Sequence, residues 1–599
     1  METEIIIVLT IMAFTIFMLI TEIVRIDVTA IITMLALSWT GILSTDEALS
    51  GFSSNAVVAM IAVMILGEGI AKTGMMSRFS KWLLKRVGRK KSSVLGSLSL
   101  SVGVLSGVIQ NIGAAALFLP SIIDIARRIK ISASVLIMPI GFAAIIGGTL
   151  TMVGSGHLIL TNDLLESANL EPYGLFAVTP VGIALLLSAI IFFVLLGKYF
   201  LPQDTSGDEF GLTEQEKIVD AFSLNKDIRY FRVDDNCKAI GKKIEETGIW
   251  KEYGINILAL KDSGGKDTKY APWRETEIKQ GDVIALYGEA ESLNRYVADY
   301  NFTKTEDDQI FEGIGDPEES GFVEVIVPPR SDLVGQTIRE FSMRKRYAVE
   351  PVMLFSKGEK VTGDFSDHKI QPGDTFIIYG PWNNIKELQS TDPFVVATPI
   401  SVESKDRSKT WQAAGSFLLA IVLAMSGFSI SISFLTGALV MVLTNVMSIQ
   451  DAYKAVEWKV VFLLVGLIPL GAAMQNSGTA EFLAENVMSV IEGSHLLVLL
   501  FTVGILSTGF SLVMSNVGAV VVLAPLVVGI GALAGVDPRP LVLLAAVNAG
   551  NSFVLPTHQV NALMMSAGGY KTKDYFKAGG GMTIVFLVVS VMFFYYTFF

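Results

Sequence analysis

Long uncharged, apolar stretches dominate the first and last thirds of the chain. In the first third they lie at about residues 5–20, 28–43, 53–67, 92–123, 131–156 and 173–197. In the last third they lie at about residues 410–426, 428–447, 460–480, 493–530, 541–565 and 578–599. A run of about 20 apolar residues is long enough for one helix to cross a lipid bilayer. The pattern therefore predicts a polytopic α-helical membrane protein.

Two of these stretches, 92–123 and 493–530, are too long for a single span. Each is interrupted near its middle by a polar dipeptide that is followed by a glycine, at Gln110–Gly113 and at Ser515–Gly518. We expect each to form a re-entrant helical hairpin that enters the membrane and returns.

The charged residues gather in the middle of the chain. Of the 46 Lys and Arg residues 27, and of the 57 Asp and Glu residues 39, lie between Asp204 and Lys409. We therefore expect a soluble insert at 204–408 between membrane halves at 1–203 and 409–599. Because the net charge of the whole chain is −11, nucleic acid is not expected as a partner. The single cysteine, Cys237, permits no intramolecular disulfide.

The two membrane halves look like copies of one another with an offset of about 404 residues. Lys72-Thr73-Gly74 aligns with Asn476-Ser477-Gly478, and Gln110-Asn111-Ile112-Gly113-Ala114 aligns with Ser515-Asn516-Val517-Gly518-Ala519. Duplication is the simplest explanation. We expect each half to be one repeat of about five spans and one hairpin.

Positive charge predicts that the repeats are inverted, because cytoplasmic loops retain Lys and Arg. The loop at 73–92 has seven basic residues and its counterpart at 475–494 has none. The loop at 154–172 has none, whereas its counterpart after Pro556 has three. This distribution predicts a multi-pass protein of the cell (plasma) membrane with a cytoplasmic insert and both termini outside. Glu2 and Glu4 precede the first stretch, so we expect a retained helix rather than a cleaved signal peptide.

Polar, helix-breaking segments occur at four places inside these stretches. They are Gln110–Gly113, Gly147–Gly156, Ser515–Gly518 and Asn548–Asn561. Irregular backbone within a membrane survives only where it is packed in protein or lines a site. Half-helix N-termini suit an anion, and carbonyl, hydroxyl and amide oxygens suit sodium. Close helix packing is the alternative explanation for any single Gly, Ser or Thr.

These segments supply our candidate site residues. For the anion we expect Asn111, Gly113, Ser155, Ser515, Asn516, Gly518 and Thr557. For sodium ions, the expected cofactor, we expect Gln110, Asn111, Gly148, Thr149, Thr151, Ser155, Ser515, Asn516, Ser552 and Thr557. No Lys or Arg lies within the four segments. Two or more co-bound sodium ions would therefore offset most of the charge of a dianion.

The motifs resemble those of the divalent anion/sodium symporter family. The resemblance rests on the hairpin Asn-x-Gly-Ala pattern, on Gly147–Ser155, on Ser552–Pro556, and on Gly568-Gly569-Tyr570 with Asp574-Tyr575. It covers both membrane halves. It implies a homodimer in which each protomer has a scaffold and a moving transport domain, with elevator-type carriage of sulfate or of di- and tricarboxylates together with sodium.

The hairpin tips depart from the Ser-Asn-Thr signature of that family. They are Gln110-Asn111-Ile112 and Ser515-Asn516-Val517. Fewer hydroxyl groups then remain to bind a carboxylate, which favours a smaller tetrahedral dianion. Members with a large cytoplasmic insert resemble sulfate transporters, so we expect sulfate rather than a dicarboxylate.

The insert contains a repeat of its own. Gly281-Asp282 and Gly373-Asp374 each precede an apolar strand, and the flanking patterns predict a helix between alternating strands. Both units, at 204–310 and 311–408, resemble the C-terminal lobe of the regulator-of-potassium-conductance (RCK) domain. Such lobes dimerise and in some relatives bind small nucleotides or ions. A purely structural role in dimerisation is the alternative.

The sequence thus favours a sodium-coupled symporter of sulfate or a similar small dianion. A sodium-coupled di- or tricarboxylate symporter is the alternative, and a ligand-gated ion channel is an alternative of another class. No T-V-G-Y-G filter is present to support a channel. Because neither a G-x-S-x-G elbow nor an intramembrane His-x-x-Glu-His pair occurs, we expect no enzyme activity and no catalytic residues.

Overall fold

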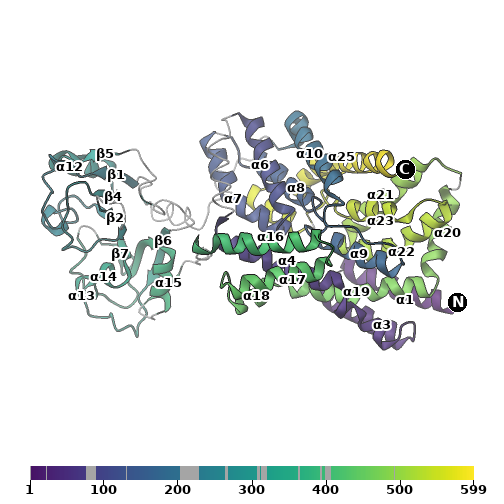
Figure 1. Cartoon of the computed structure of the whole chain (residues 1–599). Coiled ribbons are helices and arrows are strands. Elements are labelled where there is room, and N and C mark those ends of the chain that lie inside the picture. The colour runs from purple at the N-terminus through teal and green to yellow at the C-terminus, as the bar shows by residue number, and fades with distance from the viewer. Residues whose placement is uncertain are drawn as a thin grey trace. The chain divides into compact units, whose positions relative to one another are not determined.

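The computed structural model describes residues 2–21, 23–75, 90–129, 131–202, 228–262, 268–305, 311, 320–361, 364–390, 394–397, 407–491, 493–556 and 558–599. The chain divides into two compact units (Figure 1). The helical unit comprises Met1–Gly211 and Lys405–Phe599, and the sheet unit comprises Leu212–Ser404.

The first half of the helical unit is a series of helices joined by short connections. It contains α1 (Glu2–Thr21), α2 (Ile26–Trp39), α3 (Thr45–Leu49), η1 (Ser50–Ser53), α4 (Asn55–Lys72), α6 (Lys91–Ser106), α7 (Asn111–Arg128), α8 (Ser134–Gly147), α9 (Gly156–Ser167) and α10 (Thr179–Phe200). The basic segment at 76–89, which carries most of the charge used to predict orientation, lies outside the described residues.

The second half is a similar series of helices. It contains η3 (Arg407–Lys409), α16 (Thr410–Met425), α17 (Ile430–Leu443), α18 (Ile449–Ala455), α19 (Trp458–Asn476), α20 (Thr479–Ile491), α21 (Leu496–Val513), α22 (Asn516–Ala534), α23 (Pro538–Ala549), α24 (Gln559–Gly568) and α25 (Thr572–Phe598). Within the described residues, seven helices of the chain are long and apolar enough to cross a membrane. The prediction of a polytopic helical membrane protein is confirmed.

All four predicted helix breaks are present. α6 ends at Ser106 and α7 begins at Asn111, and α21 ends at Val513 before α22 begins at Asn516. The other two breaks separate α8 from α9 and α23 from α24. Each break leaves free backbone groups at two helix ends, so the structure places polar backbone where the sequence predicted it.

Helices of the two halves pack against each other reciprocally. α2 packs against α19, and its positional counterpart α17 packs against α4. In the same way α9 packs against α23, and α24 packs against α8. α10 packs against α25, as Figure 1 also shows. Gly74 (φ +67°) and Gly478 (φ +73°), which are 404 residues apart, follow α4 and α19 in the left-handed conformation that suits glycine.

Two segments that the sequence analysis treated as loops are helices. α9 occupies most of 154–172, and α20 occupies most of 475–494. α20 is amphipathic, because it buries Ala480 and Ala484 and exposes Glu481 and Glu485, whereas α9 is mostly buried. Because α20 carries charged residues on its exposed face, a search for uncharged stretches did not detect this helix.

The sheet unit contains two five-stranded antiparallel sheets. The first comprises β1 (Ile228–Arg232), β2 (Asn256–Lys261), β3 (Thr268–Tyr270), β4 (Val283–Tyr287) and β5 (Thr303–Lys304) in the order β3-β2-β4-β1-β5. The second comprises β6 (Ser320–Ile326), β7 (Glu350–Ser356), β8 (Glu359–Lys360), β9 (Thr375–Pro381) and β10 (Val395–Val396) in the order β10-β6-β9-β7-β8. When the first sheet is read from its β3 edge and the second from its β8 edge, equivalent strands occur in the same order.

Short helices accompany each sheet. They are η2 (Ile244–Thr247) and α12 (Ala290–Tyr300) for the first sheet, and α13 (Ile338–Phe341), α14 (Met343–Tyr347) and α15 (Trp382–Ser390) for the second. A shared core joins the two sheets, because Leu258 and Ala285 belong to one buried cluster with Phe322 and Ile377. Gly281 and Gly373, both at φ +84°, form the predicted Gly-Asp turns before β4 and β9.

Candidate functional site

Three oxygen atoms converge at the break between α6 and α7. The Ser106 hydroxyl lies 2.8 Å from Oδ1 of Asn111 and 2.6 Å from the carbonyl oxygen of Ala144. A serine hydroxyl carries one proton, so it can donate to only one of these two acceptors at a time. The cluster therefore has three oxygen atoms and only one hydroxyl proton to share among them. Such a set of oxygens is suited to binding a hard monovalent cation.

Gly148 and Ser155 complete the surroundings of this cluster. The Asn111 side-chain amide donates to the Ser155 hydroxyl at 3.4 Å. A Cβ atom on Gly148 would lie 2.6 Å from Oδ1 of Asn111 and would also overlap the Ser155 hydroxyl. The structure thus brings together three residues that the sequence analysis selected from segments about 40 residues apart.

The neighbouring candidate residues mainly support the helix ends. The Thr151 hydroxyl donates to the carbonyl oxygen of Gly107 at 2.6 Å, and the Thr149 hydroxyl donates to that of Ile146 at 2.6 Å. Gln110 directly precedes α7, and its carbonyl oxygen accepts from the Ala114 amide at 3.0 Å. A Cβ atom on Gly113 would meet nothing within 4 Å.

The same three-oxygen arrangement recurs at the break between α21 and α22. The Ser511 hydroxyl lies 2.7 Å from Oδ1 of Asn516 and 2.5 Å from the carbonyl oxygen of Ala549. The sequence separations are 5 and 38 residues in both clusters. The Ser515 hydroxyl accepts from the Gly518 amide at 3.1 Å and so caps α22.

The remaining candidates belong to the break between α23 and α24. Ser552 is buried, and its carbonyl oxygen accepts from the Asn561 side-chain amide at 2.7 Å. Thr557 lies outside the described residues. A hydrogen bond to its carbonyl oxygen therefore connects Ser552 to α24. Within the described part of the chain, the Ser552 hydroxyl makes no hydrogen bond, and so none to the hairpin tip.

The binding chemistry of these breaks is that of neutral oxygens and helix ends. Among the described residues, no group of three or more His, Cys, Asp and Glu side chains is placed to hold a metal ion. A divalent cation would need carboxylates, whereas sodium is coordinated by carbonyl, amide and hydroxyl oxygens. α7 and α22 begin at the two hairpin asparagines, so their N-terminal amides also suit an anion.

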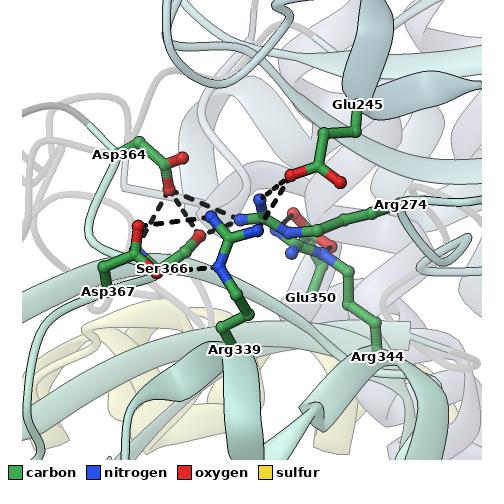
Figure 2. A network of polar contacts seen from close by, with 8 residues as sticks. All are labelled: Glu245, Arg274, Arg339, Arg344, Glu350, Asp364, Ser366 and Asp367. Atoms are coloured by element: carbon green, nitrogen blue, oxygen red, sulfur yellow. Dashed lines mark hydrogen bonds and ion pairs between the residues drawn. The ribbon is translucent and has the colours of Figure 1, made fainter.

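A second polar cluster lies within the sheet unit, where it joins the two sheets. Arg274, before β4, pairs with Glu245 at 3.1 Å and contacts Ser366 of the second sheet's lobe. Arg339 pairs with Glu245 at 2.8 Å from the opposite lobe. Figure 2 shows Glu245 facing both guanidinium groups. The hydrogen bond from Arg339 lowers the pKa of the Glu245 carboxyl below its usual value.

Arg344 forms the most buried pair of this network. It donates to both Glu350 oxygens, at 2.6 and 2.8 Å, and its guanidinium lies 4.6 Å from the Trp250 ring of the first lobe. The Glu350 side chain is 1% exposed. The adjoining cleft has a volume of about 180 Å³, which is small beside the roughly 300–1,000 Å³ of typical ligand pockets.

The family model described as citrate transporter, CitMHS, matches residues 16–547 and 493–599. The chain belongs to the citrate transporter family. It is therefore a membrane transporter, and the hairpin clusters described above lie within the matched residues.

Three proteins that are similar to this chain are also named as transporters or cotransporters. Uncharacterized transporter YfbS of Escherichia coli (strain K12) is 25% identical over 620 residues, which cover 99% of each chain. Uncharacterized transporter sll0640 of Synechocystis is 27% identical over 97% of this chain and 95% of the relative. Sodium/sulfate cotransporter 2 of Chlamydomonas reinhardtii is 23% identical over 62% of this chain and 44% of its own length. These names agree with the expectation of a transporter rather than an enzyme.

The sequence analysis did not identify Ser106 and Ser511, whose hydroxyls belong to the two hairpin clusters. A detectable signal existed, because each serine precedes a hairpin asparagine by five residues and the two are 405 residues apart. The carbonyl groups of Ala144 and Ala549 carry no such signal, since any residue has a carbonyl group.

Proposed function

We propose that the chain is a sodium-coupled secondary active symporter of a divalent anion, with sulfate as the substrate. The observation that carries the proposal is the paired three-oxygen cluster, Ser106 with Asn111 and Ser511 with Asn516. Each cluster lacks the hydrogen atoms needed to satisfy its oxygens, so each supplies ligands for one sodium ion.

In this proposal the anion binds between the two hairpin tips, where sodium and the N-termini of α7 and α22 supply positive charge. No Lys or Arg occurs in Gln110–Gly113 or Ser515–Gly518. A dianion there depends on co-bound sodium for most of its charge compensation. That dependence is a physical reason for coupling, because anion affinity falls when sodium is absent.

Sulfate is favoured over carboxylates by the departures at the hairpin tips and by the names of partial relatives in Chlamydomonas reinhardtii. A di- or tricarboxylate is the second candidate, and the description of the family as citrate transporter favours it.

The reciprocal packing of α2 on α19 and of α17 on α4 supports an internal two-fold relationship. We infer that the halves are inverted repeats and that exchange between their two packings gives elevator-type alternating access. The charge pattern supports a plasma-membrane protein with a cytoplasmic sheet unit and both termini outside.

For the sheet unit we propose a pair of RCK C-terminal-like lobes that support a homodimer. The shared strand order supports the likeness of the two lobes. The cleft is small, and Arg274, Arg339 and Arg344 are already paired with carboxylates. Both facts favour a role in holding the two lobes together over a binding site for a small nucleotide or ion.

Competition for uptake tests the substrate assignment. Proteoliposomes that contain the full chain should take up labelled sulfate in sodium buffer but not in choline buffer. Excess unlabelled sulfate should abolish the signal, and succinate or citrate at the same concentration should leave most of it. Stronger competition by citrate or succinate would favour the carboxylate symporter, and uptake that does not saturate would favour a channel.

A further inference from the structure

Four oxygen atoms around the break between α23 and α24 have no hydrogen-bond partner among the described residues. They are Oδ1 of Asn551, the hydroxyl of Ser552, Oδ1 of Asn561 and the hydroxyl of Thr583. Asn551 and Asn561 are fully buried, and Ser552 is 1% exposed. Buried polar atoms are usually satisfied, so four unsatisfied oxygens contributed by adjoining segments call for a ligand.

Hydrogen bonds hold Asn551 and Thr583 next to each other. The Asn551 side-chain amide donates to the Thr508 hydroxyl at 3.2 Å and to the carbonyl oxygen of Thr583 at 3.2 Å. Both protons of this amide are therefore used, and its orientation is fixed. Oδ1 of the same amide group consequently stays close to Thr583, whose hydroxyl is also without a partner.

The other two oxygens are held in the same manner. The Asn561 side-chain amide donates to the carbonyl oxygen of Ser552 at 2.7 Å and to that of Leu555 at 3.4 Å. The Tyr575 hydroxyl donates to the carbonyl oxygen of Asn561 at 2.8 Å and anchors its backbone. Oδ1 of Asn561 therefore remains beside Ser552, with a fixed orientation and no donor.

α25 lies close enough to this break to contribute Thr583. A Cβ atom on Gly579 would overlap the carbonyl group of Phe553, so the helix approaches the broken segment at a glycine. Thr583 is four residues later and lies on the same face of the helix. α24, α25 and the segment between α23 and α24, which carry the four oxygens, are thus in contact with one another.

This group of oxygens is not part of the duplicated hairpin arrangement. With the offset of 404 residues, Asn551 and Ser552 correspond to Gly147 and Gly148 of the first half, which have no side-chain oxygen. Thr583 corresponds to Thr179, whose hydroxyl donates to the carbonyl oxygen of Leu150 at 2.6 Å. The full group of four oxygens therefore exists in the second half alone. It is therefore additional to the two matched clusters at Asn111 and Asn516.

The chemistry of the group selects its ligand. Both amides have used their protons on other acceptors and present only an oxygen. Each hydroxyl can rotate its proton away from a ligand and present its oxygen as well. No carboxylate belongs to the group, so the oxygens suit a monovalent cation rather than a divalent one. We propose that Asn551, Ser552, Asn561 and Thr583 form a third cation site, which binds sodium and ties α24 and α25 together in the transport cycle. This proposal rests on the proposed sodium-coupled function.

Two substitutions test the site without disturbing a hydrogen bond. Thr583→Val and Ser552→Ala each remove a hydroxyl that makes none, so stability should be unchanged or slightly raised if the oxygens are merely buried. Ser99→Ala is the matched control, because Ser99 also has a buried hydroxyl without a partner among the described residues, but it lies in α6.

The measurement is equilibrium binding of labelled sodium to the purified full chain without anion. The wild type should bind three ions. At a sodium concentration too low to fill the weakened hairpin sites, the double variant Asn111→Ala/Asn516→Ala should retain one ion. Adding Thr583→Val or Ser552→Ala should weaken the binding of that ion by about tenfold, as expected for loss of one of a few ligands. Ser99→Ala added to the double variant should leave it unchanged.

The outcomes separate this inference from the proposed function. Loss of all sodium binding in the double variant, or unchanged binding after Thr583→Val and Ser552→Ala, would overturn the third site and leave the hairpin sites standing. The second result would mean that water satisfies these oxygens. A wild-type chain that binds no sodium would overturn the proposed sodium coupling itself.

Discussion

Gly148 lies directly against Asn111. A Cβ atom on Gly148 would come within 2.6 Å of Oδ1 of Asn111, although 37 residues separate the two positions in sequence. Real Cβ atoms do not approach other atoms this closely, so the glycine is required by the position of the amide rather than by its own backbone angles. The contact joins the end of α8 to the first residue of α7.

Gly148→Ala should therefore displace the Asn111 amide and weaken sodium binding. We expect the sodium concentration for half-maximal uptake to rise by roughly tenfold, which corresponds to about 1.4 kcal/mol. Gly113→Ala is the control, because a Cβ atom there meets nothing within 4 Å. Equal effects of the two substitutions would contradict the steric argument.

Replacing the hairpin asparagines should weaken sodium binding directly. Asn111→Ala and Asn516→Ala each remove an oxygen ligand, and the expected loss is about 1–3 kcal/mol. High sodium should partly restore sulfate affinity, because the two ligands are linked. Sodium titration of uptake measures both effects. Ser97→Ala and Ser188→Ala, outside the four breaks, should behave as wild type; normal sodium dependence of the asparagine variants would place the site elsewhere.

The inverted topology predicts opposite accessibility of equivalent positions. Lys90 and Ser494 are 404 residues apart, are both exposed, and immediately precede α6 and the N-cap of α21. In a Cys237→Ser background, cysteines at these two positions should react with an impermeant maleimide from opposite sides of the membrane. Labelling from the same side would end the inverted-repeat interpretation.

Loss of the buried ion pair of the sheet unit, Arg344–Glu350, should lower stability more than loss of the exposed pairs of Arg339. Arg344→Ala leaves the 1% exposed Glu350 carboxylate without its partner, which should lower local stability by about 3–5 kcal/mol. Arg339→Ala breaks pairs whose side chains are 42% to 73% exposed and should cost about 1 kcal/mol or less. Hydrogen exchange of peptides from β6, β7 and β9 in the full chain measures both. Equal protection in the two variants would contradict this ranking.

Part of this architecture could be predicted from the sequence. Glycine, proline and small polar residues within apolar stretches located all four helix breaks, and the alignment of Asn111 with Asn516 identified the central residue of each hairpin cluster. Those signals are local. Helix breaking and backbone polarity depend on the residues of one segment alone.

The remaining features depend on contacts between distant segments. The carbonyl groups of Ala144 and Ala549 complete the clusters only because α8 and α23 end beside the hairpin helices. The sequence cannot indicate this role, because the contact is made by the backbone carbonyl group and not by the alanine side chain. Thr583 likewise lies in the apolar last helix, and only its contact with Asn551 reveals it as a candidate ligand.

Gradient-driven uptake tests the central claim most directly. Proteoliposomes that contain the full chain are given an inward sodium gradient and labelled sulfate. We predict accumulation of sulfate above its external concentration, collapse of that accumulation when sodium is equal on both sides, and a loss of accumulation in the Asn111→Ala/Asn516→Ala variant at the same sodium concentration. Sulfate that only equilibrates, or that accumulates regardless of the sodium gradient, would contradict the account.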